Sequence, residues 1–272
     1  MGLDDLDAGS LDRGPGPLLG LSDAGAPVHL GPRAGHIMVV AWPGLGATTA
    51  LRSLAAQYTR RGADVDILDV ADQHTWARGQ PRVQRYADAA SVHRHLHHLA
   101  EQVRAERSGA PRVVMVESDL TINALLRFGH HPPLGGTGLD TLTTVLGAGR
   151  LYGIRVVLAC RAVPIPLRHT ARSLFTTRLL AGPTPLTWHL LGGAGTAMPP
   201  EESFHAGRMH LVSNSTERPV QLLQLTDLEA ARLASTAATS STPPHVRRRL
   251  RGRPPALAPA ASTFQIPHTR GD

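Results

Sequence analysis

Apolar and polar residues follow two different periods along this chain, and the change between them predicts strands that are separated by helices. Short apolar runs, several of them rich in Val, Ile and Leu, are typical of buried strands. The stretches between them place apolar residues three and four positions apart, which is the spacing of an amphipathic helix. The predicted strands cover 36–42, 65–70, 112–117, 154–160 and 176–181, and the predicted helices cover 47–61, 89–107, 119–127, 139–149 and 186–191.

The order of these elements predicts an α/β fold. The first strand, the first helix and the second strand form a β-α-β unit, which implies a parallel sheet with a right-handed crossover. Ahead of this unit, residues 18–30 favour a hairpin, and 209–212 with 220–223 predict a closing antiparallel pair. We therefore expect a mainly parallel central sheet flanked by helices and preceded by an N-terminal hairpin.

Composition divides the chain into a folded region, 17–225, and two terminal segments. Residues 1–16 are acidic and then rich in Gly and Pro, so we expect them to be disordered. Residues 226–272 are rich in Pro, Ala and Arg; beyond a helical turn or two at 228–233, we expect a disordered basic tail. The segment 129–136 is rich in Gly and Pro and predicts a loop.

The chain has 272 residues and a formal net charge of +7, which favours an acidic partner such as nucleic acid or an anionic membrane surface. Lysine is absent, and all 28 basic residues counted as Lys or Arg are arginines. This pattern is typical of a compositional habit, so the net charge is weaker evidence for an acidic partner than it would otherwise be. The tail holds an arginine cluster that predicts either DNA contact or a merely solvating segment. Its members are Arg247, Arg248, Arg249, Arg251 and Arg253.

A single cysteine, Cys160, excludes an intrachain disulfide and a cysteine-rich zinc site, and it suits a reducing compartment. Cys160 itself is expected to be a buried, small apolar residue. The acidic stretch 1–12 lacks the apolar centre of a signal peptide. No stretch reaches the roughly 18–20 apolar residues of a membrane helix. We expect a soluble, cytoplasmic protein without a transmembrane segment.

Four histidines lie together within the predicted helix 89–107. Two pairs share a helix face, but no nearby cysteine or acid completes a set of metal ligands. We therefore expect a solvated histidine face rather than a metal site. The four residues are His93, His95, His97 and His98.

The segment 41–49 contains glycines between the first buried strand and the first long helix. This strand-turn-helix layout directs backbone N–H groups and a helix N-terminus at a phosphate. In the full phosphate-loop pattern, Gly46 and Thr48 fit, but Ala41 takes the place of the first glycine and Ala47 that of the lysine. The candidate nucleotide-binding residues are Gly44, Leu45, Gly46, Ala47, Thr48 and Thr49.

An alternative interpretation of the same segment is a tight turn from strand to helix that binds nothing. Trp42 and Pro43 enlarge and stiffen a loop that is normally small, which favours this alternative. Thr48 then has the ordinary role of capping the helix start.

Several short phrases occur in an order that carries a family resemblance. They are Pro27-Val28-His29-Leu30, Gly46-Ala47-Thr48 with Leu51-Arg52-Ser53-Leu54-Ala55, Asp66-Ile67-Leu68-Asp69, Gly149-Arg150 with Gly153-Ile154-Arg155-Val156-Val157-Leu158-Ala159, Thr177-Arg178, Leu191-Gly192-Gly193-Ala194-Gly195 and Gly207-Arg208-Met209. Together they resemble the FtsK/SpoIIIE family of DNA-pumping ATPases, including its actinobacterial plasmid-transfer members. The resemblance implies a RecA-like P-loop NTPase fold, ATP and Mg²⁺ as ligands, DNA as a partner, and either a homo-hexamer or association with an active motor subunit.

Three positions depart from the family pattern. Ala47 replaces the lysine that reaches the β- and γ-phosphates. Glu117-Ser118 replaces an Asp-Glu pair, so Glu117 can still hold magnesium together with Thr48, whereas Ser118 cannot act as a general base at neutral pH. Cys160-Arg161-Ala162-Val163 replaces a polar Thr-Gln-Arg-Pro sensor.

Neighbouring residues are not expected to make up for these losses. Arg52 is more than a helical turn from the loop, and Asp119 is expected to point elsewhere. The resemblance implies that Arg178 is a trans-acting arginine if the family's hexamer forms; the alternative is a surface arginine at a strand end.

These observations predict an ATP-binding domain associated with DNA translocation or conjugal transfer, with weak or no ATP hydrolysis. Glu117 and Arg178 are its candidate catalytic residues, and Thr48 with Glu117 its candidate metal site. The alternative is a non-catalytic DNA- or protein-interaction module on a degenerate P-loop fold. A third possibility is an active ATPase with an atypical site.

Overall fold

The computed structural model describes residues 11–32, 34–127, 137–192, 197–213 and 216–236. The arginine cluster at 247–253 and the predicted loop at 129–136 lie outside these residues. Among the described helices, none is long and apolar enough to cross a membrane.

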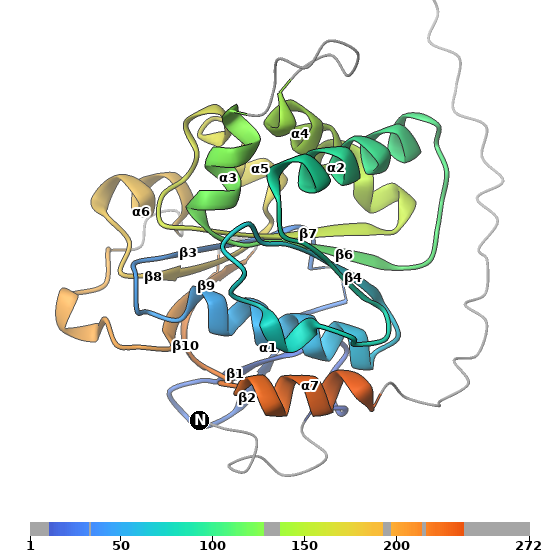
Figure 1. Cartoon of the computed structure of the whole chain (residues 1–272). Helices are drawn as coiled ribbons and strands as arrows, with labels where there is room; N and C mark the ends of the chain where they lie inside the picture. The colour runs from blue at the N-terminus through green and yellow to red at the C-terminus, as the bar shows by residue number, and fades with distance from the viewer. Residues whose placement is uncertain (1–10, 33, 128–136, 193–196, 214–215, 237–272) are drawn as a thin grey trace, which may run out of the picture. The chain divides into compact units, whose positions relative to one another are not determined.

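The described residues form one sheet with helices on both faces (Figure 1). Its strands are β1 (Leu18–Leu21), β2 (Pro27–His29), β3 (Ile37–Ala41), β4 (Asp64–Leu68), β5 (Val83–Tyr86), β6 (Arg112–Val116), β7 (Ile154–Cys160), β8 (Thr177–Ala181), β9 (Arg208–Ser213) and β10 (Thr216–Leu222). The α-helices are α1 (Ala47–Arg60), α2 (Ala89–Arg104), α3 (Ser118–Arg127), α4 (Gly138–Ala148), α5 (Ala171–Leu174), α6 (Pro185–Leu191) and α7 (Asp227–Ser235).

The strand order is β2-β1-β10-β9-β8-β3-β7-β6-β4-β5. The six strands from β8 to β5 are parallel, and β9, β10, β1 and β2 continue the sheet in antiparallel pairs. The expected parallel sheet, N-terminal hairpin and closing antiparallel pair are thus all confirmed. β3 lies between β7 and β8, which places the glycine segment that follows it near the middle of the sheet.

The strands are buried because their residues alternate between two hydrophobic cores. In β3, Ile37 and Val39 belong to a core with α1 and α7, whereas Met38 and Val40 belong to a core with α2, α3 and α4. Figure 1 shows α1 and α7 on one side of the sheet and α2, α3 and α4 on the other. A sheet covered on both faces requires apolar side chains at successive positions, which explains the continuous apolar runs in the sequence.

The sequence pattern did not predict β5, whose residues Val83–Tyr86 are only partly buried. This strand forms the edge of the sheet and pairs only with β4 among the described strands. An edge strand needs fewer apolar residues than a central one, so Val-Gln-Arg-Tyr has no apolar run.

Two segments outside the region 17–225 pack against α1. Residues 11–16, expected to be disordered, are instead placed at its C-terminal end: Leu11 is buried, and the Arg61 guanidinium donates to the carbonyls of Leu11 and Gly16. At the other end of the chain, α7 begins at a capping box made by Thr226 and Glu229 and packs on α1.

Candidate functional site

The loop between β3 and α1 is built on two glycines in the left-handed region of backbone conformation. Gly44 has φ 82° and Gly46 has φ 104°, values that side chains of other residues disfavour. Gly46 is also the residue that precedes α1, and no side chain caps this helix. The alternative role of Thr48 as a helix cap is therefore wrong.

The start of α1 presents unused hydrogen-bond donors. Within the described residues, the backbone N–H groups of Gly46, Ala47, Thr48 and Thr49 have no acceptor. Such groups at a helix N-terminus attract anions because their dipoles point the same way. All the predicted loop residues except Leu45 line a cavity; Leu45 uses its N–H and carbonyl to bond Trp42 and Gly207.

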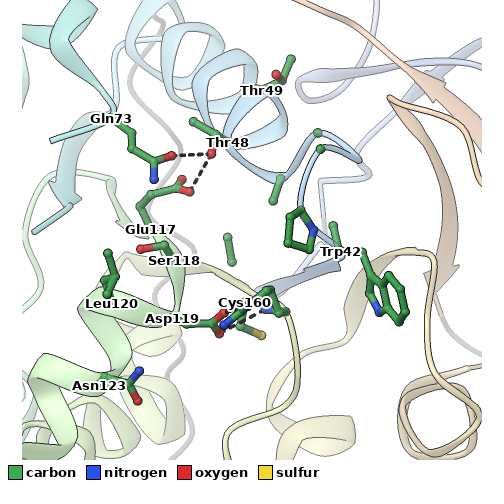
Figure 2. Close-up of a pocket in the computed structure, with 17 residues that line it drawn as sticks. Trp42, Thr48, Thr49, Gln73, Glu117, Ser118, Asp119, Leu120, Asn123 and Cys160 are labelled. Atoms are coloured by element: carbon green, nitrogen blue, oxygen red, sulfur yellow. Dashed lines mark hydrogen bonds and ion pairs between the residues drawn. The ribbon is translucent and has the colours of Figure 1, made fainter. Parts of the chain in front are cut away.

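The cavity has a volume of about 560 Å³ and lies at the carboxyl ends of β3, β6 and β7 (Figure 2). These three strands are neighbours in the sheet, so residues that follow them in the sequence meet at this edge. The lining residues are Ala41, Trp42, Pro43, Gly44, Gly46, Ala47, Thr48, Thr49, Gln73, Glu117, Ser118, Asp119, Leu120, Asn123, Ala159, Cys160 and Arg161.

Thr48 and Glu117, predicted as a metal-binding pair, are brought together in this cavity. The Thr48 hydroxyl lies 2.9 Å from Oε1 of Glu117 and 2.8 Å from Oε1 of Gln73, so two oxygens share its one proton (Figure 2). Glu117 is 2% exposed. The three oxygens converge from α1, from the end of β6 and from the loop after β4.

The sequence did not predict the residues that contact Glu117 on the side away from the cavity. Nε2 of His74 lies 2.9 Å from the second carboxylate oxygen of Glu117, and the Trp76 indole N–H donates to Nδ1 of His74 over 3.1 Å. The carboxylate of Asp69 fixes the turn by accepting the N–H groups of Ala71 and His74. His74 and Trp76 lie in a polar segment that predicted no element, and the pairing of β4 with β6 brings this segment to Glu117.

Asp119 lines the cavity, which corrects the expectation that it points elsewhere. Its carboxylate accepts the backbone N–H of Arg161 over 3.2 Å and Nε of Arg161 over 2.6 Å. The cause is Ser118, whose backbone has a φ of 69°. The alternation of side chains along β6 therefore does not continue to Asp119, and α3 begins at Ser118. Ser118 itself has a buried hydroxyl without a partner among the described residues.

Arg178 does not line this cavity. It lies in β8 beside Met38 and Val212, and it is 4% exposed, so the alternative of a surface arginine is wrong. Burial lowers the pKa of its guanidinium, and nearby Arg172 adds to this effect. A role toward a second subunit stays a prediction.

Arg52, not expected to replace the missing lysine, is directed away from the loop. Its Nη1 donates to the carbonyl of Leu225 over 3.0 Å, and its Nε lies 2.9 Å from the carboxylate of Asp227. Arg52 therefore joins α1 to α7.

The histidines of α2 do not form a solvated face, because two of them are buried. His93 is 3% and His95 8% exposed, and Nε2 of His95 lies 2.9 Å from Asp66 while its ring stacks on Tyr86. Among the described residues, no three His, Cys, Asp or Glu side chains form a metal site. Cys160 is buried as expected, and burial raises the pKa of its thiol.

Solved structures with the same architecture include three at sequence identities of 18% or less. A structure of Thermomonospora curvata EccC (ATPases 2 and 3), solved with a signal sequence peptide, has a TM-score of 0.62 at 18% identity over 83% of this chain and 43% of that one. The pCW3 conjugation coupling protein TcpA, solved with ATPγS, has a TM-score of 0.64 at 12% identity over 84% and 72%. VirB4 of Thermoanaerobacter pseudethanolicus has a TM-score of 0.55 at 11% identity over 80% and 98%.

At these identities the likeness shows the fold, which is a RecA-like P-loop ATPase fold. The chain spans less than half of the EccC segment that it matches. No protein-family model matches the sequence, and no curated protein matches it either.

Proposed function

We propose that this domain binds ATP in the cavity beside the glycine loop and hydrolyses it slowly or not at all. The observation that supports binding most strongly is the cradle itself. Unbonded N–H groups at the start of α1 line the cavity opposite Glu117, in the arrangement that suits a phosphate chain.

Thr48 and Glu117 fit a magnesium ion bound together with the nucleotide. Mg²⁺ is usually held by one or two protein oxygens, with water and phosphate oxygens completing its shell. The hydroxyl of Thr48 and the carboxylate of Glu117 are hard oxygen donors 2.9 Å apart. When bound, the ion supplies positive charge to the phosphates; Thr48 and Glu117 fix where that charge lies.

Hydrolysis requires more than this cradle. Phosphoryl transfer depends on cations that stabilise the developing charge and on a group that orients the attacking water. Ala47 provides no cation, and Ser118 provides no base. The nearest acid, Asp119, is already paired with Arg161. Slow turnover follows from these three facts.

The resemblance to the FtsK/SpoIIIE family and the likeness to a conjugation coupling protein support a setting in DNA translocation or conjugal transfer. In this proposal the domain is a regulatory or structural subunit of a hexamer or of an active motor. The tail arginines at 247–253 are candidates for DNA contact. If the domain is an interaction module alone, DNA binding does not respond to nucleotide.

Isothermal titration of the full chain with ATPγS tests the proposal. We expect saturable binding of one nucleotide per chain in Mg²⁺, and much weaker binding in EDTA. Thr48→Val removes the hydroxyl while keeping the shape, and it should reproduce the effect of EDTA. Absence of binding in Mg²⁺ would overturn the proposal. A parallel titration with duplex DNA compares the full chain with a chain truncated before Ser241. If the tail arginines contact DNA, the truncated chain should bind DNA more weakly.

A further inference from the structure

The lining of the cavity contains three charged residues, and two of them are acids. Glu117 and Asp119 contribute negative charge, and Arg161 contributes the single positive charge among the lining residues. A nucleotide triphosphate brings several negative charges, and Mg²⁺ offsets two of them. The P-loop pattern meets this need with a lysine, which is Ala47 here. The remaining positive charge has to come from elsewhere in the lining.

Arg161 lies at the carboxyl ends of the parallel strands, where the cavity is found. It directly follows β7, the strand that pairs with β3 on one side and with β6 on the other. The glycine loop follows β3 and Glu117 follows β6, so Arg161 emerges between the phosphate cradle and the acidic residue. Arg52 and Arg178 do not line the cavity, and Arg52 is engaged with Asp227.

The contact with Asp119 holds Nε of Arg161 and leaves the two terminal guanidinium nitrogens available. The Asp119 carboxylate receives the backbone N–H and Nε of Arg161. Within the described residues, the two terminal guanidinium nitrogens have no partner, and the side chain is 66% exposed. A guanidinium presents paired N–H groups in a fork that matches phosphate oxygens. Anchoring through Nε preserves that fork.

We propose that Arg161 is the phosphate-binding cation of this cavity and that Asp119 is a positioning residue that orients it. This inference rests on the proposed binding of ATP, and it adds the group that replaces the missing lysine. The positive charge then approaches the phosphates from the end of β7 rather than from the start of α1. Binding of a triphosphate is retained, while the position of the cation differs from that of the full phosphate loop.

The test is the affinity of the full chain for Mg²⁺-ATPγS in Arg161→Gln and Arg161→Lys variants. We expect Arg161→Gln to weaken binding by about tenfold or more, since it removes charge-assisted hydrogen bonds. Arg161→Lys should fall between this variant and the wild type, because it keeps the charge and loses the fork. Arg78→Gln is the matched control: Arg78 is 65% exposed and pairs with Asp72 over 2.7 Å, but it does not line the cavity.

A second comparison tests the role of Asp119. Asp119→Asn should weaken binding in the wild-type background and should not weaken it in the Arg161→Gln background. Equal weakening in both backgrounds would overturn the positioning role. If the wild type binds ATPγS and Arg161→Gln binds it equally well, the inference fails and the proposed function stands. If the wild type binds no nucleotide, both fail.

Discussion

Nε2 of His74 lies 2.9 Å from Oε2 of Glu117, and both side chains are almost fully buried. The indole N–H of Trp76 can only donate, so Nδ1 of His74 must accept it and the ring proton is on Nε2, facing Glu117. Thr48 donates to the other carboxylate oxygen. Glu117 is thus held by one donor from behind and one donor from the cavity, which fixes its orientation.

Substitution of His74 should change the orientation of Glu117, although His74 itself does not line the cavity. We expect His74→Leu to lower the free energy of unfolding by about 1–3 kcal/mol, because a buried carboxylate oxygen loses its partner. Mg²⁺-dependent ATPγS binding should weaken as well. His74→Gln restores an N–H donor and should recover part of both losses. Urea denaturation and calorimetry measure the two effects. Unchanged binding by a folded His74→Leu variant would contradict this role.

Restoring the missing lysine should tighten nucleotide binding. Ala47 lines the cavity at the first position of α1, so a lysine there extends its ammonium toward the same space. We expect Ala47→Lys to raise the affinity for Mg²⁺-ATPγS by about tenfold through a charge-assisted hydrogen bond. Thr49→Lys adds the same charge two residues further along the helix and should give a smaller gain. An equal gain from both would indicate a general effect of charge.

Tryptophan fluorescence should report nucleotide binding through a single residue. Trp42 lines the cavity and is 55% exposed, whereas Trp76 and Trp188 are 6% and 7% exposed. A ligand in the cavity should therefore change the emission of Trp42. The response should disappear in Trp42→Phe and persist in Trp188→Phe. A response that persists in Trp42→Phe would place the ligand elsewhere.

His36 should make the folded state sensitive to acid. It is 1% exposed, and its Nδ1 accepts the backbone N–H of Val156. Burial lowers its pKa from 6.5 to about 4, with further lowering from Arg150 and Arg155 against a backbone hydrogen bond that raises it. Below pH 6.5 the unfolded chain therefore binds a proton that the folded chain does not. Stability should fall as the pH drops from 6.5 to 4, by up to about 3 kcal/mol from this residue.

His36→Asn tests this pH dependence, since its Oδ1 can accept the N–H of Val156 and its side chain does not titrate. Urea denaturation between pH 4 and 7 should give a shallower loss of stability than in the wild type. His98→Asn, at an exposed position of α2, is the control and should keep the wild-type slope. Equal slopes for all three chains would contradict the assignment to His36.

Periodicity predicted the central strands because their burial on both faces imposes long apolar runs, as in β6 and β7. It missed β5, where a polar edge strand gives no such signal. The glycine loop and the pairing of Thr48 with Glu117 followed from local motifs. His74 could not be found in this way, because it belongs to no motif and lies in a polar segment that predicted no element, although it contacts Glu117 in the fold. The direction of Asp119 was predicted wrongly, because nothing in the residue pattern indicates that Ser118 has a positive φ.

Recovery of the nucleotide from the protein tests most directly whether this cavity binds ATP without rapid cleavage. The full chain is incubated with labelled ATP and Mg²⁺, separated from free nucleotide, and the bound nucleotide is identified. We predict that ATP is retained and remains intact through the separation, whereas Thr48→Val retains much less. Retention of ADP with released phosphate, or no retained nucleotide, would contradict this prediction.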